Sequence, residues 1–478
     1  MRIFDVEFNP FVKKYSKNVK RVALVYPNRY VGGISNLGMQ YIYFAINELE
    51  GLICERFYAD VFDGFRSLES GTPLNKFDLA LFSLQYELDY FKAVEIAKKF
   101  SGLKIAGGPC VMINPLPIKK YFDAFFIGEC EDYIQEIVKA KRIEDLEGIP
   151  GIYTGKEDKV KRIHSELGKH IEREIIGDGA YGRCFLLEIG RGCIRKCRFC
   201  VVRQIYSPPR WRKIEDLPEV KYVEKVAIIA PSPTDHPQFK EIVERYTSLG
   251  FQVSPSSIRA DAVDEELLEI LSRTSNSLTL APETASEKLS EILQKNISFE
   301  DIISVAEMSK GRFEKIKLYY MIGLPGESFE DVLQILDQAE KVKKIVGRVE
   351  ISVNPLIPKP HTPMQWLPFG GKVELRDGID ELRKKMKLIK KECRKRGIEL
   401  QMESLKEFEV QAVLSRGEED VSKIFERQKI DFEKYLGAIE IENTLPWDFI
   451  DHGYSKERLK KEYEKIWEIL NSEAGNIK

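Results

Sequence analysis

Short apolar runs alternate with amphipathic stretches along the first third of this chain. Strand-like runs occupy residues 21–27, 53–59, 77–84, 104–108 and 122–127, and apolar residues recur at helical spacing over 39–49 and 90–100. Continuous apolar runs separated by helices predict a doubly wound parallel sheet, a Rossmann-like domain. Ligands of such sheets bind at the carboxyl ends of the strands, which here are the loops at 28–35, 83–85 and 107–110.

A second alternation of strands and helices begins at Cys184. The strand runs are 184–189, 220–230, 252–258, 277–280, 315–322 and 348–353, and helical stretches lie at 236–250, 264–273, 299–311 and 327–345. About six strand–helix units are enough for a partial (β/α)6 barrel. Reaction sites of such barrels lie at the carboxyl ends of the strands, so we expect the chemistry in the loops that follow them.

Two less regular regions complete the chain. Residues 141–180 are charged and turn-rich, which predicts a linker with a hairpin near 152–162. A helix over 377–396 carries nine Lys and Arg residues between Arg383 and Arg396, while Leu382, Met386, Ile389 and Cys393 recur on one face. One face of that helix should pack and the rest should face water.

These patterns divide the α/β chain into five segments. They are an extension (1–20), a Rossmann-like domain (21–142), a linker (143–182), a partial barrel (183–372) and a C-terminal α+β domain (373–478).

Composition narrows the class of protein. The chain has 478 residues, with 74 basic and 76 acidic side chains, so its net charge of −2 creates no general attraction to nucleic acid or membranes. It contains no apolar run of membrane-spanning length, and its start lacks a secretion-type apolar core. Eight cysteines are too few for a disulfide framework at this length. We expect a cytoplasmic protein with no membrane contact.

Three of the cysteines crowd into one glycine-flanked loop. Cys193, Cys197 and Cys200 have the spacing C-x3-C-x2-C directly after the strand run that starts at Cys184. Thiolates so close together suit a soft metal centre, and three of them leave one iron of a four-iron cluster without a protein ligand. The alternative is zinc, which needs a fourth ligand. Cys184 is the nearest one, and an extended chain would carry it ~30 Å from Cys193.

Phe199 completes a C-x3-C-x-aromatic-C pattern that resembles the radical S-adenosylmethionine (SAM) enzymes. The resemblance implies a 4Fe-4S cluster on Cys193, Cys197 and Cys200, with SAM on the open iron. It also implies reductive cleavage of SAM to a 5'-deoxyadenosyl radical, and an electron donor such as ferredoxin or flavodoxin. In such enzymes the chemistry belongs to the cofactor, and the protein supplies position and exclusion of water.

The same resemblance assigns SAM contacts to strand-end loops. It places the SAM amino group at 230–233, which includes Ser232, the carboxylate at Arg259, the ribose at Glu283, and the adenine at the turn of Gly323, Pro325 and Gly326. Phe199 is a further residue that the resemblance assigns to SAM binding. Glycine admits a flat ring close to the main chain, and a carboxylate suits a diol. Arg259 has an equally simple alternative, which is a salt bridge to Asp261 or Asp264.

The first domain resembles the cobalamin-binding domain that precedes many radical SAM barrels, on the strength of Gly107–Pro109 and Gly128–Glu131. The metal-binding form of that domain carries a histidine after its first strand. The five histidines here are His164, His170, His236, His361 and His452. Cobalamin held without a histidine ligand and a substrate-recognition role therefore stay open, because fold resemblance does not carry function.

The proline-rich segment 354–363 resembles the barrel exit of methylthiotransferase-like radical SAM proteins. The whole architecture predicts methyl or methylthio transfer to an unactivated C–H position of an unknown substrate, which is a small molecule, a protein or RNA. Methylthio transfer usually needs a second cluster, for which Cys54, Cys110 and Cys130 are the available cysteines. The Arg-Trp-Arg of 207–212 suits either an anion or a solvated loop.

A different class of function is also consistent with the sequence. In this alternative the protein is a non-catalytic zinc or iron–sulfur protein that binds RNA through the basic helix 377–396. Iron content and SAM cleavage separate it from an enzyme.

Overall fold

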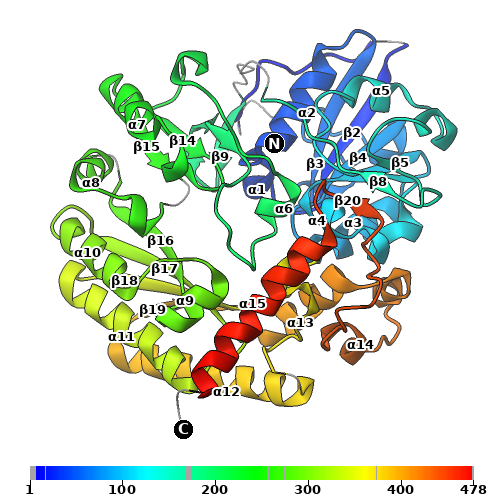
Figure 1. Ribbon diagram of the computed structural model, residues 1–478. Coiled ribbons are helices and arrows are strands. Elements are labelled where there is room, and N and C mark those ends of the chain that lie inside the picture. Colours follow the sequence, from blue (N-terminus) through cyan, green and yellow to red (C-terminus); the bar gives the residue numbers. More distant parts are fainter. Residues whose placement is uncertain are drawn as a thin grey trace.

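Two open parallel sheets organise the chain (Figure 1). The structure is a computed structural model that describes residues 7–16, 18–167, 175–255, 258–273, 275–372 and 374–475. His170 and two residues of the third barrel strand's end, Ser256 and Ser257, lie outside the described residues.

The first sheet has six strands in the order β3-β2-β4-β5-β6-β7. Its strands are β2 (Lys20–Tyr26), β3 (Leu52–Tyr58), β4 (Leu79–Ser83), β5 (Leu103–Gly107), β6 (Ala124–Phe126) and β7 (Ile152–Tyr153). All pairs are parallel except β6 with β7. The helices are α1 (Tyr30–Ile34), α2 (Leu37–Glu48), α3 (Tyr90–Lys98), α4 (Pro109–Ile113) and α5 (Ile134–Lys139).

Alternate residues of β2 explain how helices cover both faces. Ala23 and Val25 pack in the core that includes α3, and Val22 and Leu24 pack in the core that includes α2 and α5. Side chains on a strand alternate between faces, so the continuous apolar run buries both of them. The predicted doubly wound sheet is confirmed.

The second sheet is an open partial barrel. β11 (Phe185–Glu188), β14 (Lys225–Ile229) and β15 (Gln252–Pro255) pair in parallel, as do β16 (Ser277–Glu283), β17 (Lys315–Ile322), β18 (Val349–Pro355) and β19 (Glu399–Gln401). A parallel bridge from Ile258 to Leu280 links the two groups. Among the described residues no strand pairing joins β19 back to β11, so the barrel stays open.

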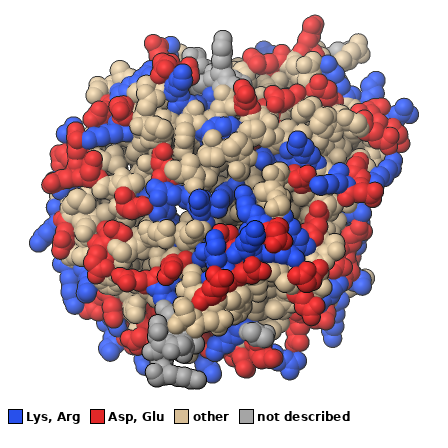
Figure 2. Space-filling model, in the orientation of Figure 1, with Lys and Arg blue, Asp and Glu red and all other residues tan. Residues whose placement is uncertain are grey.

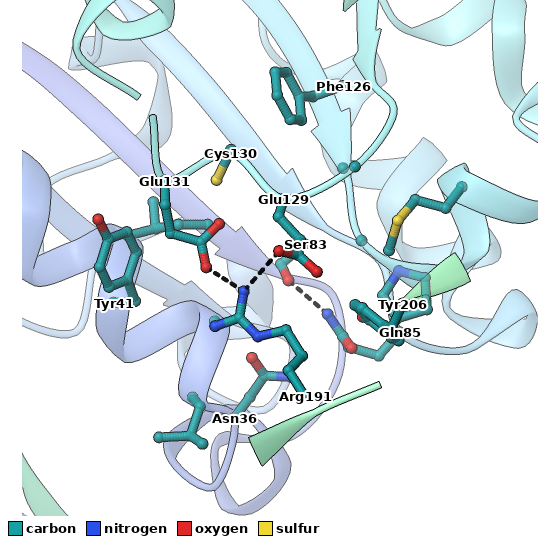
Figure 3. Close-up of a pocket in the computed structure, with 18 of the residues that line it drawn as sticks. Asn36, Tyr41, Ser83, Gln85, Phe126, Glu129, Cys130, Glu131, Arg191 and Tyr206 are labelled. Carbon is teal, nitrogen blue, oxygen red and sulfur yellow. Dashed lines mark hydrogen bonds and ion pairs between the residues drawn. The ribbon is translucent and has the colours of Figure 1, made fainter. Parts of the chain in front are cut away.

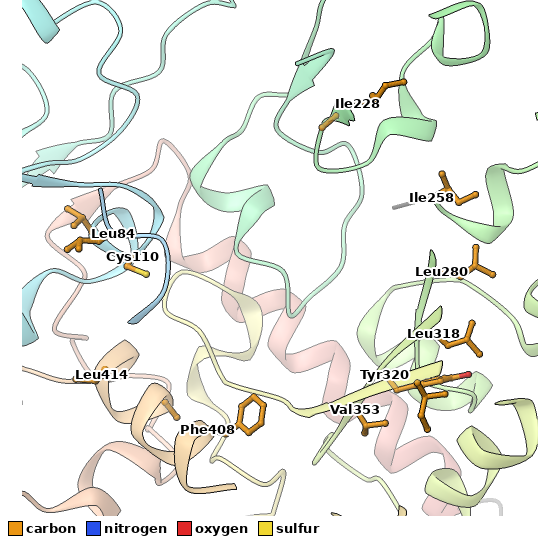
Figure 4. Close-up of a cluster of buried hydrophobic side chains, with 14 of the residues drawn as sticks. Leu84, Cys110, Ile228, Ile258, Leu280, Leu318, Tyr320, Val353, Phe408 and Leu414 are labelled. Carbon is orange, nitrogen blue, oxygen red and sulfur yellow. The ribbon is translucent and has the colours of Figure 1, made fainter. Parts of the chain in front are cut away.

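Helices cover the outer face of this sheet. They are α7 (Phe239–Ser248), α8 (Glu265–Ser272), α10 (Phe299–Ser309) and α11 (Phe329–Val346), whereas α9 (Glu287–Leu293) packs in a separate cluster with Met321 and Ile466. The buried residues Leu318 and Tyr320 of β17 face them, and the Tyr320 hydroxyl donates to Gln338 on α11 at 2.6 Å. Figure 4 shows Leu280, Leu318 and Val353 in the same apolar cluster.

The inner face of the open barrel is accessible instead of filled. Lys317, Tyr319 and Met321 alternate with the buried residues of β17, and Tyr319 is 41% exposed. Period-two geometry therefore directs these side chains inward. A polar, accessible inner face is where a barrel of this kind can hold reactants.

The segment between the two sheets is not the predicted hairpin. β7 extends the first sheet, whereas β8 (Val160–Lys161) pairs in parallel with β20 (Ile450–Asp451), near the other end of the chain. Further on, β9 (Ile176–Gly179) pairs with β1 (Glu7–Phe8) and β10 (Gly182–Arg183). Local charge and turn content did not reveal these distant partners.

The C-terminal region adds to the barrel before it turns back to the first sheet. Its helices are α12 (Leu375–Arg396), α13 (Leu405–Arg416), α14 (Phe432–Leu436) and α15 (Lys456–Gly475). β19 continues the barrel sheet past residue 372. α15, red in Figure 1, runs across the molecule from the first sheet toward the barrel helices. None of the described helices is long and apolar enough to cross a membrane.

Two buried histidines join the C-terminal region to the first sheet. The Nε2 atoms of His361 and His452 lie 3.1 Å and 3.0 Å from the carbonyl oxygens of Ile113 and Met112, at the end of α4. Their rings contact each other with centroids 4.3 Å apart. Burial lowers the pKa of His361 to about 4 and that of His452 well below its ordinary value. Both rings are therefore neutral donors near pH 7.

Acid should weaken this junction. Unfolded histidines take up protons near pH 6.5, whereas these two resist protonation until far lower pH, so the free energy of unfolding should fall by about 1.4 kcal/mol per histidine and pH unit between pH ~6.5 and ~4. The double variant His361→Gln/His452→Gln keeps donors to both carbonyls but cannot titrate. It should lose less stability than the wild type between pH 7 and 5 in urea titrations. Equal losses in the two proteins would contradict this.

Candidate active site

The cysteine loop begins where the first barrel strand ends. After β11, β12 (Gly190–Arg191) pairs with β13 (Arg210–Trp211), so the loop that carries the cysteines closes on itself. Trp211 packs so closely on Gly190 that an added Cβ would lie 2.3 Å from its ring. The short helix α6 (Val202–Ile205) follows the last cysteine. The loop is therefore anchored at both ends.

The three thiols lie close together in a poorly solvated loop. Burial raises the pKa of Cys193, Cys197 and Cys200, to about 12 for Cys200, where Cys197 and Cys193 add to the rise and the backbone amides of Val202 and Arg203 oppose it. Within the described chain no three His, Cys, Asp or Glu side chains converge tightly enough to hold a single metal ion. A four-iron cluster spreads its thiolates over separate corners, which a loop of neighbouring but not converging thiols fits.

The ends of the third and fourth barrel strands meet beside Cys197. Arg259 donates to Asp261 at 2.9 Å and 3.0 Å and to the Lys295 carbonyl at 2.9 Å, and Lys295 forms an ion pair of 3.0 Å with Glu283. Both cations oppose the burial-induced rise in the pKa of the Cys197 thiol. The structure thus brings Arg259 and Glu283 together near the cysteines, and it also contains the Arg259–Asp261 salt bridge that was the simpler alternative.

Glu283 holds an unusual backbone conformation at the end of β16. Its φ of +70° is left-handed, and the pairing of β16 with β17 is irregular between Leu280 and Glu283. Left-handed conformations of residues other than glycine occur at sites where the surrounding structure enforces them. Lys295 lies between Gln294 and Asn296, which also have positive φ angles, of 53° each. These two turns bring the Glu283 carboxylate and the Lys295 ammonium group together at the same end of the barrel.

The end of the second strand carries a related set of charges. Ser232 is buried near Asp235, and Asp235 forms an ion pair with Arg195 of the cysteine loop. Arg195 also reaches Asp261 at 3.2 Å. The cysteine loop is therefore linked by one arginine to the ends of the second and third strands.

The turn after β17 contacts two C-terminal helices, α12 through an ion pair and α15 through apolar side chains. Glu327 accepts from the Gly323 amide at 2.8 Å and from buried Lys385 of α12 at 2.8 Å. Phe199 and Leu324 pack in a cluster with Ile466 of α15. Gly326 touches the same helix, since an added Cβ would lie 2.2 Å from Leu470. Pro325 lies in the same turn. Of the residues assigned to SAM in this region, Phe199 and Gly326 therefore lie against the C-terminal helix, while Gly323 lies against Leu382 of α12.

A cavity of about 460 Å³ lies between the two sheets. From the first sheet it is lined by Ser83, Gln85, Gly107, Gly108, Gly128 and Glu129, and from the barrel by Glu188, Gly190, Arg191, Ala230 and Pro231. Two of the three expected loops thus contribute. The third side comes from Asn36, Leu37 and Gly38 at the start of α2, and not from residues 28–35.

A buried ion network forms one wall of this cavity. Arg191 bonds to Glu131 at 2.5 Å, to Glu129 at 3.2 Å and to Glu188 at 2.9 Å, and Figure 3 shows its head group between the first two carboxylates. Arg210 pairs with Glu129 at 2.6 Å. The network ties the last strand ends of the first sheet to the first strand end of the barrel, directly before the cysteines.

The structure also shows what the Arg-Trp-Arg motif contacts and how the basic helix α12 is placed, which the sequence left open. Arg210 bonds to Glu129 and Arg212 bonds to Glu188 at 2.9 Å, so both arginines of the Arg-Trp-Arg motif take part in the domain junction. In the basic helix α12, Lys385 is buried in its pair with Glu327, and Arg396 pairs with Asp337. The exposed cations of this helix include five that take part in no salt bridge of the described structure, namely Lys384, Lys387, Lys390, Lys391 and Arg394, so α12 keeps a solvated basic face.

The cysteines of the first domain do not form a second cradle. Cys54 packs in the core on the α2 side of the sheet and Cys110 in the core on the α3 side, while Cys130 lies in the cavity wall. A sheet separates the first two. The hypothesis of a second three-cysteine cluster in this domain is therefore wrong.

Sequence reasoning missed several charged residues near the cysteines. Lys295 and Asp235 belong to no known motif of this chain, and Arg195 occupies a variable position between Cys193 and Cys197. Lys317 and Tyr319 of the inner barrel face were part of an ordinary strand run. One signal was present: a strand facing helices on one side and an open barrel on the other must alternate, and Lys315–Ile322 does.

Comparison with known proteins agrees with this architecture. The family model described as the radical SAM superfamily matches residues 187–339, and a model for the N-terminal part of radical SAM proteins matches residues 38–149. An uncharacterized protein from Methanocaldococcus jannaschii is 38% identical over 454 residues, which is 89% of this chain and 97% of that protein.

More distant similarity covers less of the chain. The ribosomal protein uS12 methylthiotransferase RimO from Clostridioides difficile is 23% identical over 33% of this chain and 40% of its own length. The structure of TsrM from Kitasatospora setae, a radical SAM methyltransferase, superposes with a TM-score of 0.52 at 15% identity, covering 70% of this chain and 72% of that one. The fold, the cysteine loop and the matched family models agree, and this chain belongs to the radical SAM superfamily of enzymes, whose cofactors are a 4Fe-4S cluster and SAM.

Proposed function

We propose that this enzyme transfers a methyl group to an unactivated C–H position, with the 4Fe-4S cluster held by Cys193, Cys197 and Cys200. The observation that carries the proposal is the convergence of Glu283, Arg259 and Lys295 beside Cys197, in a chain whose cavity between the two sheets is lined by Gly190 and Arg191 at the start of the cysteine loop. When bound, the reduced cluster and SAM supply a 5'-deoxyadenosyl radical that abstracts hydrogen.

The chain's own residues position SAM. Glu283 accepts hydrogen bonds from the ribose, and Arg259 offers its planar fork to the carboxylate. The loop at Ser232 holds the amino group. Gly323, Pro325 and Gly326 contact adenine, and Phe199 is a further contact of SAM. Since Glu283 and Arg259 already have protein partners, Lys295 and Asp261 hold these side chains ready and share them with the cofactor.

Methyl transfer fits better than methylthio transfer. The second cluster that methylthio transfer needs has no cradle in the first domain, because Cys54 and Cys110 lie in the cores on opposite faces of its sheet. The similarity to RimO covers a third of the chain, and it leaves the first domain's role to be argued from its own residues.

The cavity between the sheets suits cobalamin without a histidine ligand. Gly107, Gly108 and Gly128 leave its edge free of side chains, and Gly108 could carry none, since a Cβ would meet the Leu84 carbonyl oxygen at 2.6 Å. None of the described residues that line it is a histidine. At about 460 Å³ the cavity encloses only part of so large a ligand, so the remainder would extend into the opening.

The remaining assignments follow from this proposal. The enzyme acts in the cytoplasm with an electron donor such as ferredoxin or flavodoxin. Its parts are the extension 1–20, the cobalamin-binding-like domain 21–142, the linker 143–182, the barrel 183–372 and the C-terminal domain 373–478. β7 of the linker adds a strand to the first sheet, and β19 of the C-terminal domain adds one to the barrel.

Iron content tests the cluster. Protein reconstituted without oxygen should hold about four irons and four sulfides per chain, and Cys197→Ala should lose the brown colour and SAM cleavage together. Cys393→Ala, a buried cysteine of α12, is the matched control and should keep both. Tetrahedral zinc without iron in protein from anaerobic cells would contradict the 4Fe-4S assignment and favour the zinc alternative.

Glu283→Ala tests the SAM site. Loss of a charge-assisted hydrogen bond should weaken SAM binding by about 1.5–3 kcal/mol while iron content stays the same. Titration of the reconstituted protein with SAM measures this. Glu287→Ala, four residues along at the start of α9, is the control. Unchanged affinity in Glu283→Ala would remove the residue from the site.

Cobalt spectroscopy tests the cavity. Bound cob(II)alamin should show no nitrogen superhyperfine splitting in its EPR spectrum, because no histidine lines the described part of the cavity. If splitting appears, His164 is its source, since its buried Nδ1 has no hydrogen-bond partner in the described structure and Glu129 lies nearby. Failure of hydroxocobalamin and methylcobalamin to bind at micromolar concentration would make the cavity a substrate site.

A further inference from the structure

Three arginines from distant parts of the chain gather around α6, directly after the cysteine loop. Arg203 lies on α6, Arg162 follows β8, and Arg458 lies in the first turns of α15. Arg458 donates to the Gln204 side chain at 2.6 Å, and its guanidinium lies 4.3 Å from the centre of the Tyr454 ring. Arg162 donates to the Ser207 carbonyl at 2.6 Å. In Figure 2, Lys and Arg side chains gather in the middle of the face where Figure 1 places α6 and α15.

In the described structure these three cations have no carboxylate at ion-pair distance, although Glu129 acts on Arg162 and Glu462 acts on Arg458 from farther away. Within the part of the chain that the structure describes, Arg162, Arg203 and Arg458 take part in no salt bridge, whereas Arg191 and Arg210 nearby are each paired with carboxylates. Arg162 is only 8% exposed, and its Nε and Nη1 atoms are buried without a described partner. Burial and the charge of Arg203 lower the pKa of Arg458.

An arrangement of this kind is costly unless something neutralises it. Like charges held together repel, and a buried guanidinium with unpaired nitrogens loses its hydration without compensation. An anionic ligand would supply both the missing charge and the missing acceptors. Arginine forks match the oxygens of phosphate and carboxylate groups, and three guanidinium groups balance a phosphate of about −1.5 to −2 better than a carboxylate of −1.

We propose that Arg162, Arg203 and Arg458 bind a phosphoryl group of the substrate. That the bound molecule is the substrate rests on the proposed function; that the site binds phosphate does not. The position supports the assignment, because the backbone amides of Val202 and Arg203 that begin α6 interact with the Cys200 thiol. A phosphoryl group held by Arg203 would anchor the substrate one short turn from the cluster loop.

Phosphate binding to the full chain tests the proposal. Inorganic phosphate should bind at millimolar concentration or tighter in a calorimetric titration, and Arg203→Gln and Arg458→Gln should each weaken binding about tenfold or more. Arg376→Gln is the matched control, because Arg376 on α12 has an 84% exposed side chain and pairs with exposed Glu433. It should bind phosphate like the wild type. Melting temperatures check that each variant is folded.

Three results would overturn the site. They are the absence of phosphate binding, equal binding by Arg203→Gln and Arg458→Gln in folded protein, and displacement of phosphate by SAM, which would assign the arginines to the cofactor. Acetate binding as tight as phosphate would overturn the choice of a phosphoryl group. Phosphate binding by protein that fails to cleave SAM would keep the site and overturn the proposed function instead.

Two further ligands identify the source of the phosphoryl group. A nucleoside monophosphate that competes with phosphate, with no gain for a single-stranded RNA oligonucleotide, assigns it to a small molecule. Much tighter, steeply salt-dependent binding of the oligonucleotide assigns it to a nucleic acid backbone.

Discussion

The ion network of Glu129, Arg191, Arg210 and Glu188 holds together the two halves on which the site depends. Each half presents the carboxyl ends of a parallel sheet, and the network joins those ends where the chain passes into the cysteine loop. Because Glu129 is only 5% exposed, its carboxylate loses most of its hydration, and the two arginines together offset that desolvation cost. Arg191 and Glu188 also line the cavity, so this contact lies between the cavity and the start of the cysteine loop.

Local sequence pattern predicted the parts of this fold that local physics decides. Apolar runs such as 21–27 and 315–322 are strands because each buries a face against helices, and the C-x3-C-x2-C spacing drew attention to the loop that follows the first barrel strand. The partners of 152–162 were not predictable, because β8 pairs with a strand almost three hundred residues later. Pairings of that separation leave no trace in local periodicity.

The candidate site shows the same division. Glu283 and Arg259 were candidates from the family resemblance, and the structure brings both near Cys197. Lys295 was not found, because its place depends on a turn of three consecutive residues of which two have positive φ. The arginines of 207–212 had two readings from sequence alone, and only the positions of Glu129 and Glu188 show that the domain junction uses them. Charged residues acquire their roles from partners that are distant in the chain.

The C-terminal helix has a consequence for how the protein is made. α15 packs on Phe199 and on the turn at Gly326, and β20, just before it, pairs with β8. These contacts close the cysteine loop from one side, yet they come from residues at least 250 positions after the cysteines. During synthesis the loop therefore stays uncovered until the ribosome has also made α15. Delivery of iron and sulfide has its widest access in that interval, and the finished helix then covers the loop.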